Sequence, residues 1–318
     1  MIKTTNVRNI LRPIADFIDP GRKLRRYIIE KNAMRKYSGI NVESAEYGNK
    51  KIYAYLENGT SFCAGKFGAT ESKTYMSCME GELKKVGVSK SIRDEIYLHS
   101  GVYPVSDANL QRFSNLYEAC AEATDLLGVW FQPGEVEIIK NSGAINRNLF
   151  FDFTGLEPYY HNSPWSKGLV GKKVLVVSPF SESIMRQYEK RSLIWPSGVL
   201  PDFELKTLNF PHSKALVDNE FESWFEMYDS FCEKMETMDF DIAITGAGAA
   251  TLPLAAYAKK MGKQGIGMGG SLQILFGIVG RRWEKHPFFQ GVINNQWVRP
   301  SGLEIPKSKN KIENSAYW

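Results

Sequence analysis

The stretch ITGAGAATLP, from Ile244 to Pro253, joins two segments of different pattern. An apolar run, MDFDIAI, leads into it, and a run with helical spacing, LPLAAYAKKMG, leads out of it. A strand, a glycine-rich loop and a helix in this order form the repeating unit of parallel α/β sheets. The pattern therefore predicts a strand that ends near Gly246 and a helix that starts near Thr251. Because such helix starts bind phosphate groups, the stretch also raises the question of which ligand it holds.

The glycine pattern of this loop departs from the fingerprint of nicotinamide and flavin enzymes. Gly246 and Gly248 match the first two glycines, but Thr251 occupies the third position. The acidic residue that would bind a ribose about 20 positions further on is missing, because the next strand reads QGIGMGG. The unit also comes late in the chain. We therefore expect a more general anion site, in which Thr251 caps the helix and Pro253 lies in its first turn.

The alternation of strands and helices continues on both sides of this loop. KKVLVVS is a near-continuous apolar run, as in strands that are buried on both faces. Further strands are predicted over 200–210 and 264–268, and helices over 179–191, 218–238 and 271–280. This order predicts a doubly wound, mostly parallel, Rossmann-like α/β sheet with helices on both faces.

The first half of the chain has a less regular pattern. We predict a hairpin over 44–59 with Asn58-Gly59 as its turn, a strand over 60–68 and an amphipathic helix after it. A helix capped by Ser106 or Asp107 is predicted over 105–130, followed by a short strand at VEIIK (136–140) and an aromatic connector over 148–165. The irregular tail over 295–318 ends in two large aromatic residues, so we expect it to dock on the body of the protein.

The net charge of +5 is concentrated at the N-terminus. Residues 1–40 hold ten Lys or Arg and three Asp or Glu, and subtracting this +7 from the total leaves −2 for the rest. The pattern predicts a basic helical segment over 1–45 and a single α/β domain over 46–318. The basic segment is either a helix that contacts an anionic membrane surface or a phosphate-rich ligand, or a solvated helix packed on the domain. Nucleic-acid binding is disfavoured, because no stacking motif or basic patch continues past it.

Other features of the composition narrow the class of protein. No run approaches the roughly 20 apolar residues that a membrane-spanning helix needs. The four cysteines are scattered in apolar surroundings, which is typical of reduced thiols in a cytoplasmic protein. The four histidines show no metal-binding spacing, so we expect no histidine-based metal centre.

A second glycine loop follows the next predicted strand. Gly269 and Gly270 come directly after QGIGM, and Ser271 begins a helix-like run. Because neighbouring parallel strands end at the same edge of a sheet, the two loops would form a cradle for a diphosphate. The alternative is that both loops are tight turns needed only for packing.

The stretch GKFGATES holds a lysine and a glutamate in one predicted strand-to-helix turn. Lys66 would neutralise a phosphate, and Glu71 would accept a proton or bind a sugar hydroxyl. The alternative is that Glu71 only complements the helix dipole.

Further candidates come from strand ends and from one helix end. Ser178, Ser181 and His212 follow predicted strands and would bind sugar or phosphate, although serines at such places are also common helix caps. Arg281 and Arg282 would bind phosphate, or would form a solvated helix end beside a core tryptophan.

Several of these stretches together resemble one bacterial family. GKFGATE, KKVLVVSPFSESIMRQYEKR, LPDFELKTL, FDIAITGAGAATLPLAAYAKKMGK, MGGSLQILFGIVGRRW and AYW are similar to glycosyltransferases of the GT-D fold class and related capsule and O-antigen biosynthesis sequences. The resemblance covers roughly residues 60–318 and is densest over 239–283. It implies a hexosyltransferase-type enzyme that uses a nucleotide sugar, with a UDP-sugar expected, and a glycan or lipid-linked acceptor in surface polysaccharide synthesis. The protein would then work in the cytoplasm, at the inner face of the membrane.

One position departs from the family pattern. Metal-using members carry an Asp-x-Glu pair in this turn, whereas here Ala69 replaces the aspartate and Glu71 remains. We therefore expect a metal-independent site without cofactor, in which Glu71 is the base, Lys66 assists and displacement proceeds with inversion. The nucleotide sugar is expected to bind residues in this and the following segments: Gly68, Ser178, Ser181, His212, Gly246, Gly248, Ala249, Thr251, Gly269, Gly270, Ser271, Gln273, Arg281 and Arg282.

Two other functions remain open at the level of sequence. The first is an NAD-dependent oxidoreductase on a Rossmann-like fold. The second is a non-catalytic protein that binds a nucleotide or glycan within a biosynthetic complex. Thermal stabilisation by NAD(H) rather than UDP would indicate the first, and a Glu71→Ala variant that alters only binding would indicate the second.

Overall fold

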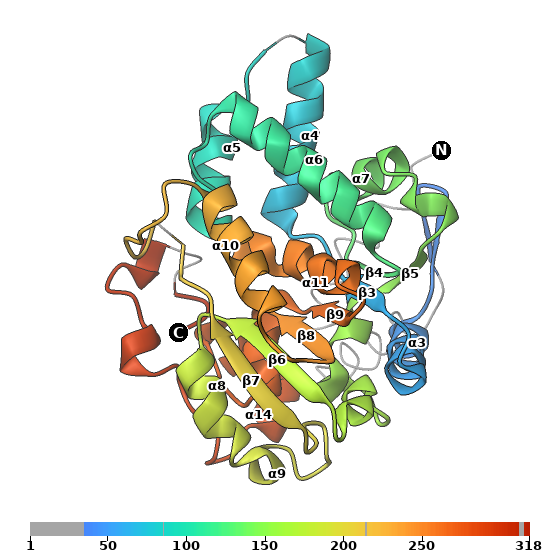
Figure 1. The fold of residues 1–318 in the computed structure, drawn as a ribbon, viewed down its shortest axis with the longest axis vertical. Coiled ribbons are helices and arrows are strands. Elements are labelled where there is room, and N and C mark those ends of the chain that lie inside the picture. The colour runs from blue at the N-terminus through green and yellow to red at the C-terminus, as the bar shows by residue number, and fades with distance from the viewer. Residues whose placement is uncertain (1–34, 85, 214, 312–314) are drawn as a thin grey trace, which may run out of the picture.

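The computed structural model describes residues 35–84, 86–213, 215–311 and 315–318. Its central feature is a seven-stranded sheet with the strand order β5-β4-β3-β9-β8-β6-β7, in which all pairs are parallel (Figure 1). The strands are β3 (Phe62–Gly65), β4 (Leu126–Val129), β5 (Leu149–Asp152), β6 (Lys173–Ser178), β7 (Glu204–Asn209), β8 (Ile242–Thr245) and β9 (Gln264–Gly267). The predicted α/β class with a parallel, Rossmann-like sheet is confirmed.

Helices cover both faces of this sheet. On one face lie α4 (Ala69–Lys84), α6 (Asp107–Ala123), α10 (Trp224–Glu236) and α11 (Thr251–Lys260). On the other lie α3 (Ala45–Asn58), α8 (Ser181–Tyr188), α9 (Arg191–Ile194) and α14 (Pro287–Val292). The remaining α-helices are α5 (Lys90–Glu95), α7 (Glu135–Asn141), α12 (Leu272–Leu275) and α13 (Arg281–Glu284), and β1 (Arg35–Tyr37) pairs antiparallel with β2 (Ile40–Val42).

Burial on both faces of the sheet explains why residues 174–177 of the strand β6 are all apolar. Successive side chains of a strand point to opposite faces of the sheet. Val174 and Val176 belong to the hydrophobic cluster on the α8 side, whereas Leu175 and Val177 belong to the cluster on the α11 side. Both faces of the strand are therefore buried, which is what the run KVLVV predicts.

The predicted hairpin over 44–59 is wrong, because these residues form the helix α3. Ser44 caps it by accepting a hydrogen bond from the Tyr47 N–H. Ile52 and Leu56 are buried four residues apart, as on one face of a helix. Gly59 has a φ of 70° and ends the helix rather than turning a hairpin.

Two further assignments in the first half also differ from the sequence prediction. VEIIK lies in the helix α7 rather than in a strand, and the predicted helix over 105–130 ends at Ala123. The strand β4 follows at Leu126–Val129, and β5 lies at Leu149–Asp152 inside the predicted aromatic connector. The predicted cap of Ser106 is confirmed, since its hydroxyl accepts from the Asn109 N–H.

The second half of the chain follows the prediction closely. Its strands and its longer helices lie within the predicted segments, and Pro253 lies in the first turn of α11. The exception is the run over 271–280, whose α-helical part, α12, has only four residues. The part of the chain that the structure describes holds no helix that is long and apolar enough to cross a membrane.

The tail docks on the body, as predicted. Ala316 and Trp318 are buried, and the Trp318 indole N–H donates to the Glu304 carbonyl at 3.0 Å. Gly280 is required where the tail lies closest, because a Cβ on it would be 2.5 Å from the Ala316 carbonyl oxygen. The basic segment predicted over 1–45 lies mostly outside the described residues.

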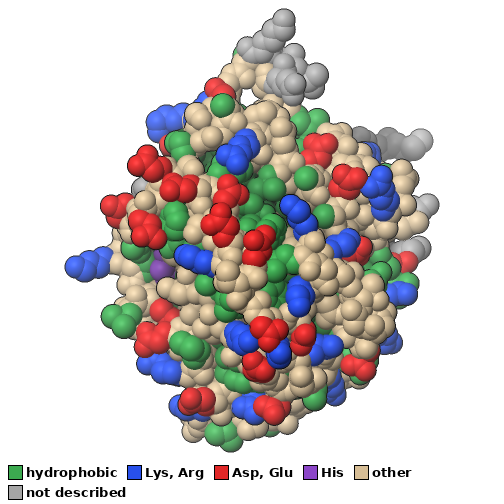
Figure 2. Space-filling model, viewed as in Figure 1, with side chains coloured by type: hydrophobic (Ala, Val, Ile, Leu, Met, Phe, Trp, Pro, Cys, Tyr) green, Lys and Arg blue, Asp and Glu red, His purple; other side chains and the backbone are tan. Residues whose placement is uncertain are grey.

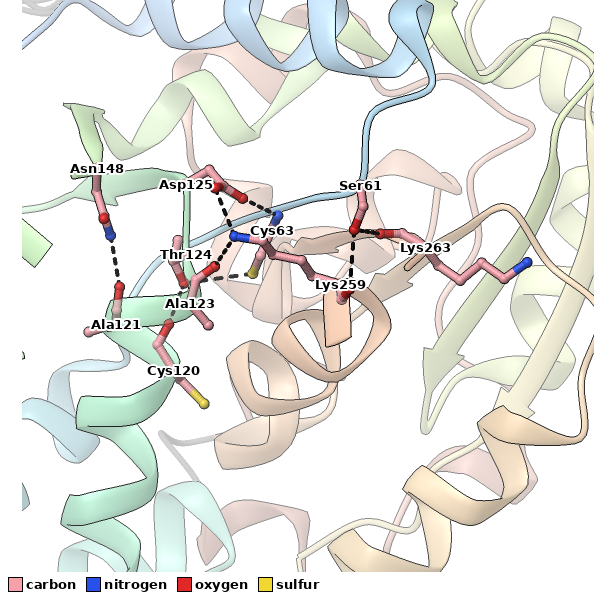
Figure 3. Close-up of polar contacts among 10 residues, drawn as sticks. All are labelled: Ser61, Cys63, Cys120, Ala121, Ala123, Thr124, Asp125, Asn148, Lys259 and Lys263. Atoms are coloured by element: carbon pink, nitrogen blue, oxygen red, sulfur yellow. Dashed lines mark hydrogen bonds and ion pairs between the residues drawn. The ribbon is translucent and has the colours of Figure 1, made fainter. Parts of the chain in front are cut away.

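A polar cluster joins the elements at the amino edge of the sheet (Figure 3). The Lys259 ammonium donates to the Asp125 carboxylate at 2.8 Å and to the Ala123 carbonyl at 2.7 Å. The other oxygen of Asp125 accepts from the Cys63 N–H at 2.9 Å. The pair therefore ties α11 to the segment between α6 and β4, and to the start of β3.

Replacing Lys259 by Met is expected to lower the free energy of unfolding by about 1.5–3 kcal/mol, because hydrogen bonds to charged groups contribute on that scale. Lys263→Met is the matched control. The cluster uses only the backbone carbonyl of Lys263, and its side chain extends away from the other residues in Figure 3. Chemical denaturation of both variants checks this, and equal losses would contradict the role assigned to Lys259.

Candidate functional site

A cavity of about 560 Å³ lies at the carboxyl edge of the sheet. Its walls come from the segments that follow all seven strands, and from the docked tail. The pair β6 and β8 is a switch point, since the chain leaves β6 toward β7 on one side and leaves β8 toward β9 on the other. Ligands of open α/β sheets bind at such points, so this cavity is the candidate site.

Most of the candidate residues from the sequence line this cavity, and five do not. Those in its lining are Lys66, Gly68, Glu71, His212, Gly246, Gly248, Thr251, Gly269, Gly270, Ser271 and Arg282. The residues outside the lining are Ser178, Ser181, Ala249, Gln273 and Arg281.

The turn between β3 and α4 places a carboxylate against the backbone of the cavity wall. Glu71 lies in the first turn of α4, and Lys66 lies directly after β3. A Cβ on Gly68 would lie 1.7 Å from the Glu71 carboxylate, so only glycine leaves room for this position of the side chain. Gly68 therefore serves the placement of Glu71.

The environment of Glu71 disfavours its charge. The residue is only 7% exposed, and burial raises its pKa. Its own backbone N–H, the Ser100 hydroxyl and the positive charge of Lys66 oppose this effect. A carboxylate with a raised pKa is a better proton acceptor at neutral pH than an exposed one, provided that it is ionised.

Lys66 lies in an aromatic slot. Its ammonium is 4.2 Å from the ring centroid of Trp130 and 5.7 Å from that of Phe153, which is cation–π geometry. Burial lowers the pKa of Lys66, and the carboxylates of Glu157, Glu71 and Glu135 oppose that shift. The slot fixes the cation at one end of the cavity.

The two glycine loops are in direct contact. A Cβ on Gly246 would lie 2.7 Å from the Gly269 carbonyl oxygen, so this glycine lets the loops pack together. Gly248 and Gly269 have φ values of 55° and 65°, in the left-handed region that favours glycine. Thr251 is the first residue of α11, and its hydroxyl accepts from the Ala247 N–H at 2.9 Å, so it orders the loop rather than capping the helix.

The turn between β6 and α8 is already filled by a carboxylate of the protein. Glu304 accepts hydrogen bonds from the Ser183 N–H at 3.0 Å and from the Ser183 hydroxyl. The Ser178 hydroxyl accepts from the Phe180 N–H, and the Ser181 hydroxyl donates to the Ser178 carbonyl. These serines therefore shape the turn, and Glu304 occupies the helix start where an anion would bind.

The other candidates outside the cavity have structural contacts. Ala249 is fully buried, and its carbonyl accepts from the Tyr117 hydroxyl at 3.0 Å. The Gln273 amide donates to the Ile278 and Tyr317 carbonyls, which joins α12 to the docked tail. Arg281 is exposed beside the cavity-lining Arg282.

His212 and Arg282 reach the cavity through contacts with the tail. The His212 Nε2 lies 2.9 Å from the Glu304 carbonyl, which can only accept, so this nitrogen carries the proton and Nδ1 is an acceptor. Burial lowers the pKa of His212 to about 4, so the ring is neutral at pH 7. The Arg282 guanidinium lies 4.8 Å from the Tyr317 ring centroid, which holds it at the cavity rim.

The sequence analysis did not predict the cavity residues that follow β4 and β5. Trp130 follows β4, and Phe153, Glu157 and Tyr160 follow β5. These residues follow strand ends, which is the signal that identified the other candidates. The signal was hidden because neither strand was recognised.

Glu135, buried at 1% exposure, organises the turn that carries Trp130. Its carboxylate accepts from the Gln132 N–H at 2.8 Å and from the Trp130 N–H at 3.3 Å. Between them, Phe131 has a φ of 65°, a strained value for a residue with a side chain. Glu135 thus stabilises the turn that presents Trp130 to Lys66.

Glu135→Gln is expected to remove a pH dependence of stability. Burial raises the pKa of Glu135 from 4.5 to about 7, so the folded state binds the proton more tightly than the unfolded state. Its contribution is fully present below pH 4.5 and is lost as the pH rises to about 7, a change on the order of 3 kcal/mol. Lys66 and Tyr37 are the neighbouring titratable groups on other elements.

The measurement is urea unfolding of both proteins from pH 4.5 to 8. The burial of neutral His212 acts in the opposite direction in both, so only the difference between the curves reports on Glu135. That difference is expected to change with pH and to level off above pH 7. A constant difference would show that the Glu135 carboxyl titrates normally.

We also searched for a metal site and for similar proteins. Among the residues that the structure describes, no group of three or more His, Cys, Asp or Glu side chains is arranged to hold a metal ion. Comparison of the chain with protein-family models, curated proteins and solved structures finds no match.

Proposed function

We propose that this protein is a glycosyltransferase that moves a sugar from a nucleotide sugar, with a UDP-sugar as the expected donor, to a glycan or lipid-linked acceptor in surface polysaccharide synthesis. One observation carries the proposal: the buried Glu71 carboxylate shares a cavity with two touching glycine loops and with the cations of Lys66 and Arg282. Sugar transfer needs a base for the acceptor and positive groups for the leaving diphosphate, and this cavity offers both.

The reaction assigns a role to each group. The acceptor hydroxyl gives its proton to Glu71 while its oxygen forms a bond to the anomeric carbon of the donor sugar. The bond between that carbon and the diphosphate oxygen breaks, and the electron pair leaves with the nucleoside diphosphate. Direct displacement of this kind inverts the anomeric configuration.

The leaving nucleoside diphosphate gains one negative charge when the bond to the anomeric carbon breaks, and the groups around it suit the stabilisation of that charge. The glycine loops allow close approach of backbone N–H groups at the start of α11, and Arg282 and Lys66 line the same cavity and supply positive charge. Each oriented donor of this type contributes about 10²–10³-fold to the rate in enzymes that stabilise an oxyanion. No step requires a metal ion or another cofactor.

Acidic and basic side chains are interspersed over the face shown in Figure 2. The selectivity for an anionic donor would therefore come from the cavity itself. Contact with the inner face of a membrane through residues 1–40, and a cytoplasmic location, remain parts of the proposal.

A thermal-shift panel tests the function. The intact protein is heated with UDP, GDP, CMP, UDP-sugars or NAD(H), each with manganese or with EDTA. A ligand at 100 times its Kd adds about 2.7 kcal/mol of stability, so binding is readily seen. Stabilisation by a nucleoside diphosphate in EDTA supports the proposal. Stabilisation by NAD(H) alone would indicate an oxidoreductase, and a requirement for manganese would contradict the metal-independent site.

A further inference from the structure

The cavity extends along the carboxyl edge of the sheet, because residues that follow every strand from β5 to β7 line it, so its two ends are built from different strands. At one end, Trp130 follows β4, and Lys66 and Glu71 follow β3. The glycine loops after β9 and β8 lie in the middle, since these strands are the next in the sheet order. At the other end, Phe180 follows β6 and the segment 210–213 follows β7 (Figure 1).

The end beside β3 and β4 contains the ionisable groups. Lys66, Glu71 and Glu157 all line it, and Glu135 lies close enough to shift the pKa of Lys66. A proton acceptor and a cation within one wall suit the reacting part of a substrate. The rings of Trp130 and Phe153 also line this end.

The end beside β6 and β7 is aromatic, and the described residues that line it include no Lys, Arg, Asp or Glu. The His212 ring lies 5.7 Å from the Phe180 centroid and 5.6 Å from the Trp318 centroid. Phe210 and Trp224 also line this end, and both are buried. His212 adds a polar acceptor, because the Glu304 carbonyl fixes its proton on Nε2 and leaves Nδ1 unprotonated.

A nucleotide sugar has three parts in a fixed order, namely the sugar, the diphosphate and the nucleoside. If the glycine loops bind the diphosphate, the sugar and the nucleoside must extend to opposite ends of the cavity. The anomeric carbon must lie near Glu71, so the sugar belongs at the end beside β3. The nucleoside is then left with the aromatic end, where rings can stack on a base and an acceptor can meet one of its N–H groups.

We propose, on the premise of the function above, that the nucleoside of the donor binds against the aromatic cluster of Phe180, Phe210, His212 and Trp318, and that the sugar binds beside Glu71, Trp130 and Glu157. This assigns a base-recognition subsite to the β6 and β7 end and fixes the direction of the donor in the cavity. The chemistry of the subsite selects an aromatic base that can donate an N–H to an imidazole nitrogen.

Calorimetric binding to the full chain tests the assignment. The nucleoside diphosphate that binds the unaltered protein best among UDP, GDP, CDP and ADP is titrated into Phe180→Leu and His212→Asn. Loss of a stacking ring or of the acceptor is expected to weaken its affinity by roughly 5–100-fold. Inorganic diphosphate, which has no base, is expected to bind these variants as it binds the unaltered protein.

Glu157→Gln and Trp130→Leu are the matched variants at the opposite end. They are expected to weaken binding of the corresponding nucleotide sugar more than binding of the nucleoside diphosphate, which they affect only through Lys66. Circular dichroism confirms folding of each variant, and His212→Asn tests the subsite alone if Phe180→Leu unfolds. Weaker nucleoside diphosphate binding only in the Trp130 and Glu157 variants would overturn the direction assigned here and leave the transferase proposal standing. Failure of the unaltered protein to bind any nucleoside diphosphate would overturn both.

Discussion

Glu71→Gln is expected to lower the rate of sugar transfer by about 10²–10⁴-fold, the usual contribution of a general base. Glutamine has nearly the same size and shape but cannot accept the acceptor's proton. The affinity for the nucleoside diphosphate is expected to stay close to that of the unaltered protein, because Glu71 acts on the acceptor. Measuring kcat by release of the nucleoside diphosphate, together with Kd by calorimetry, separates the two effects.

A second variant moves the same carboxylate without removing it. In Gly68→Ala the new methyl group would lie 1.7 Å from the carboxylate, so Glu71 must leave its position. The rate is expected to fall with the charge still present, which distinguishes placement from charge. Glu80→Gln, at an exposed position further along α4, is the matched control and is expected to retain full activity. Transfer at the original rate by Glu71→Gln would exclude this residue as the base.

The regular half of the fold could be predicted because its strands are buried on both faces. Runs such as KVLVV and IAIT are buried on both sides of the sheet and are therefore almost entirely apolar. Glycines mark the ends of two strands, since Gly246 follows β8 and Gly267 is the last residue of β9. The longer helices between them, α8, α10 and α11, have enough residues to show their own periodicity. The neighbouring positions of the two glycine loops followed from this, since parallel strands that pair end at the same edge.

Three elements of the first half, α3, β4 and β5, could not be predicted, and the reason is physical. Asn58-Gly59 suits a hairpin turn and a helix end equally well, and only the packing of Ile52 and Leu56 decides for the helix. The strand β4 follows α6 after only two residues, so its apolar run continued the helical pattern, and β5 lies inside a long aromatic stretch without a strand boundary signal. Without them, Trp130 and Glu157 could not be placed at the cavity.

The site itself shows which features depend on tertiary structure. Lys66, Glu71 and the glycines follow strands and could be found from local pattern alone. The role of Glu304 could not, because the carboxylate reaches the start of α8 from a distant and irregular segment. Local sequence identified the helix start after β6 as an anion site, but it did not identify the side chain that fills it.

Trp318→Ala is expected to lower the free energy of unfolding by about 3–5 kcal/mol, as removal of a large buried aromatic side chain usually does. Trp318 is 6% exposed and packs against the rings of Phe180 and His212. Its indole N–H also donates to the Glu304 carbonyl. The substitution therefore removes apolar contacts and one hydrogen bond at the same place.

Trp318→Phe separates these contributions. Phenylalanine keeps a ring against Phe180 and His212 but has no N–H, so a loss of about 1 kcal/mol is expected. Urea unfolding of both variants gives the two values. A loss below 1 kcal/mol for Trp318→Ala would mean that the tail does not unfold with the domain. Phe180 follows β6 and His212 follows β7, so Trp318 packs against the ends of two strands of the sheet. A loss of about 3–5 kcal/mol for Trp318→Ala would therefore mean that the contacts that form the aromatic end of the cavity also stabilise the fold.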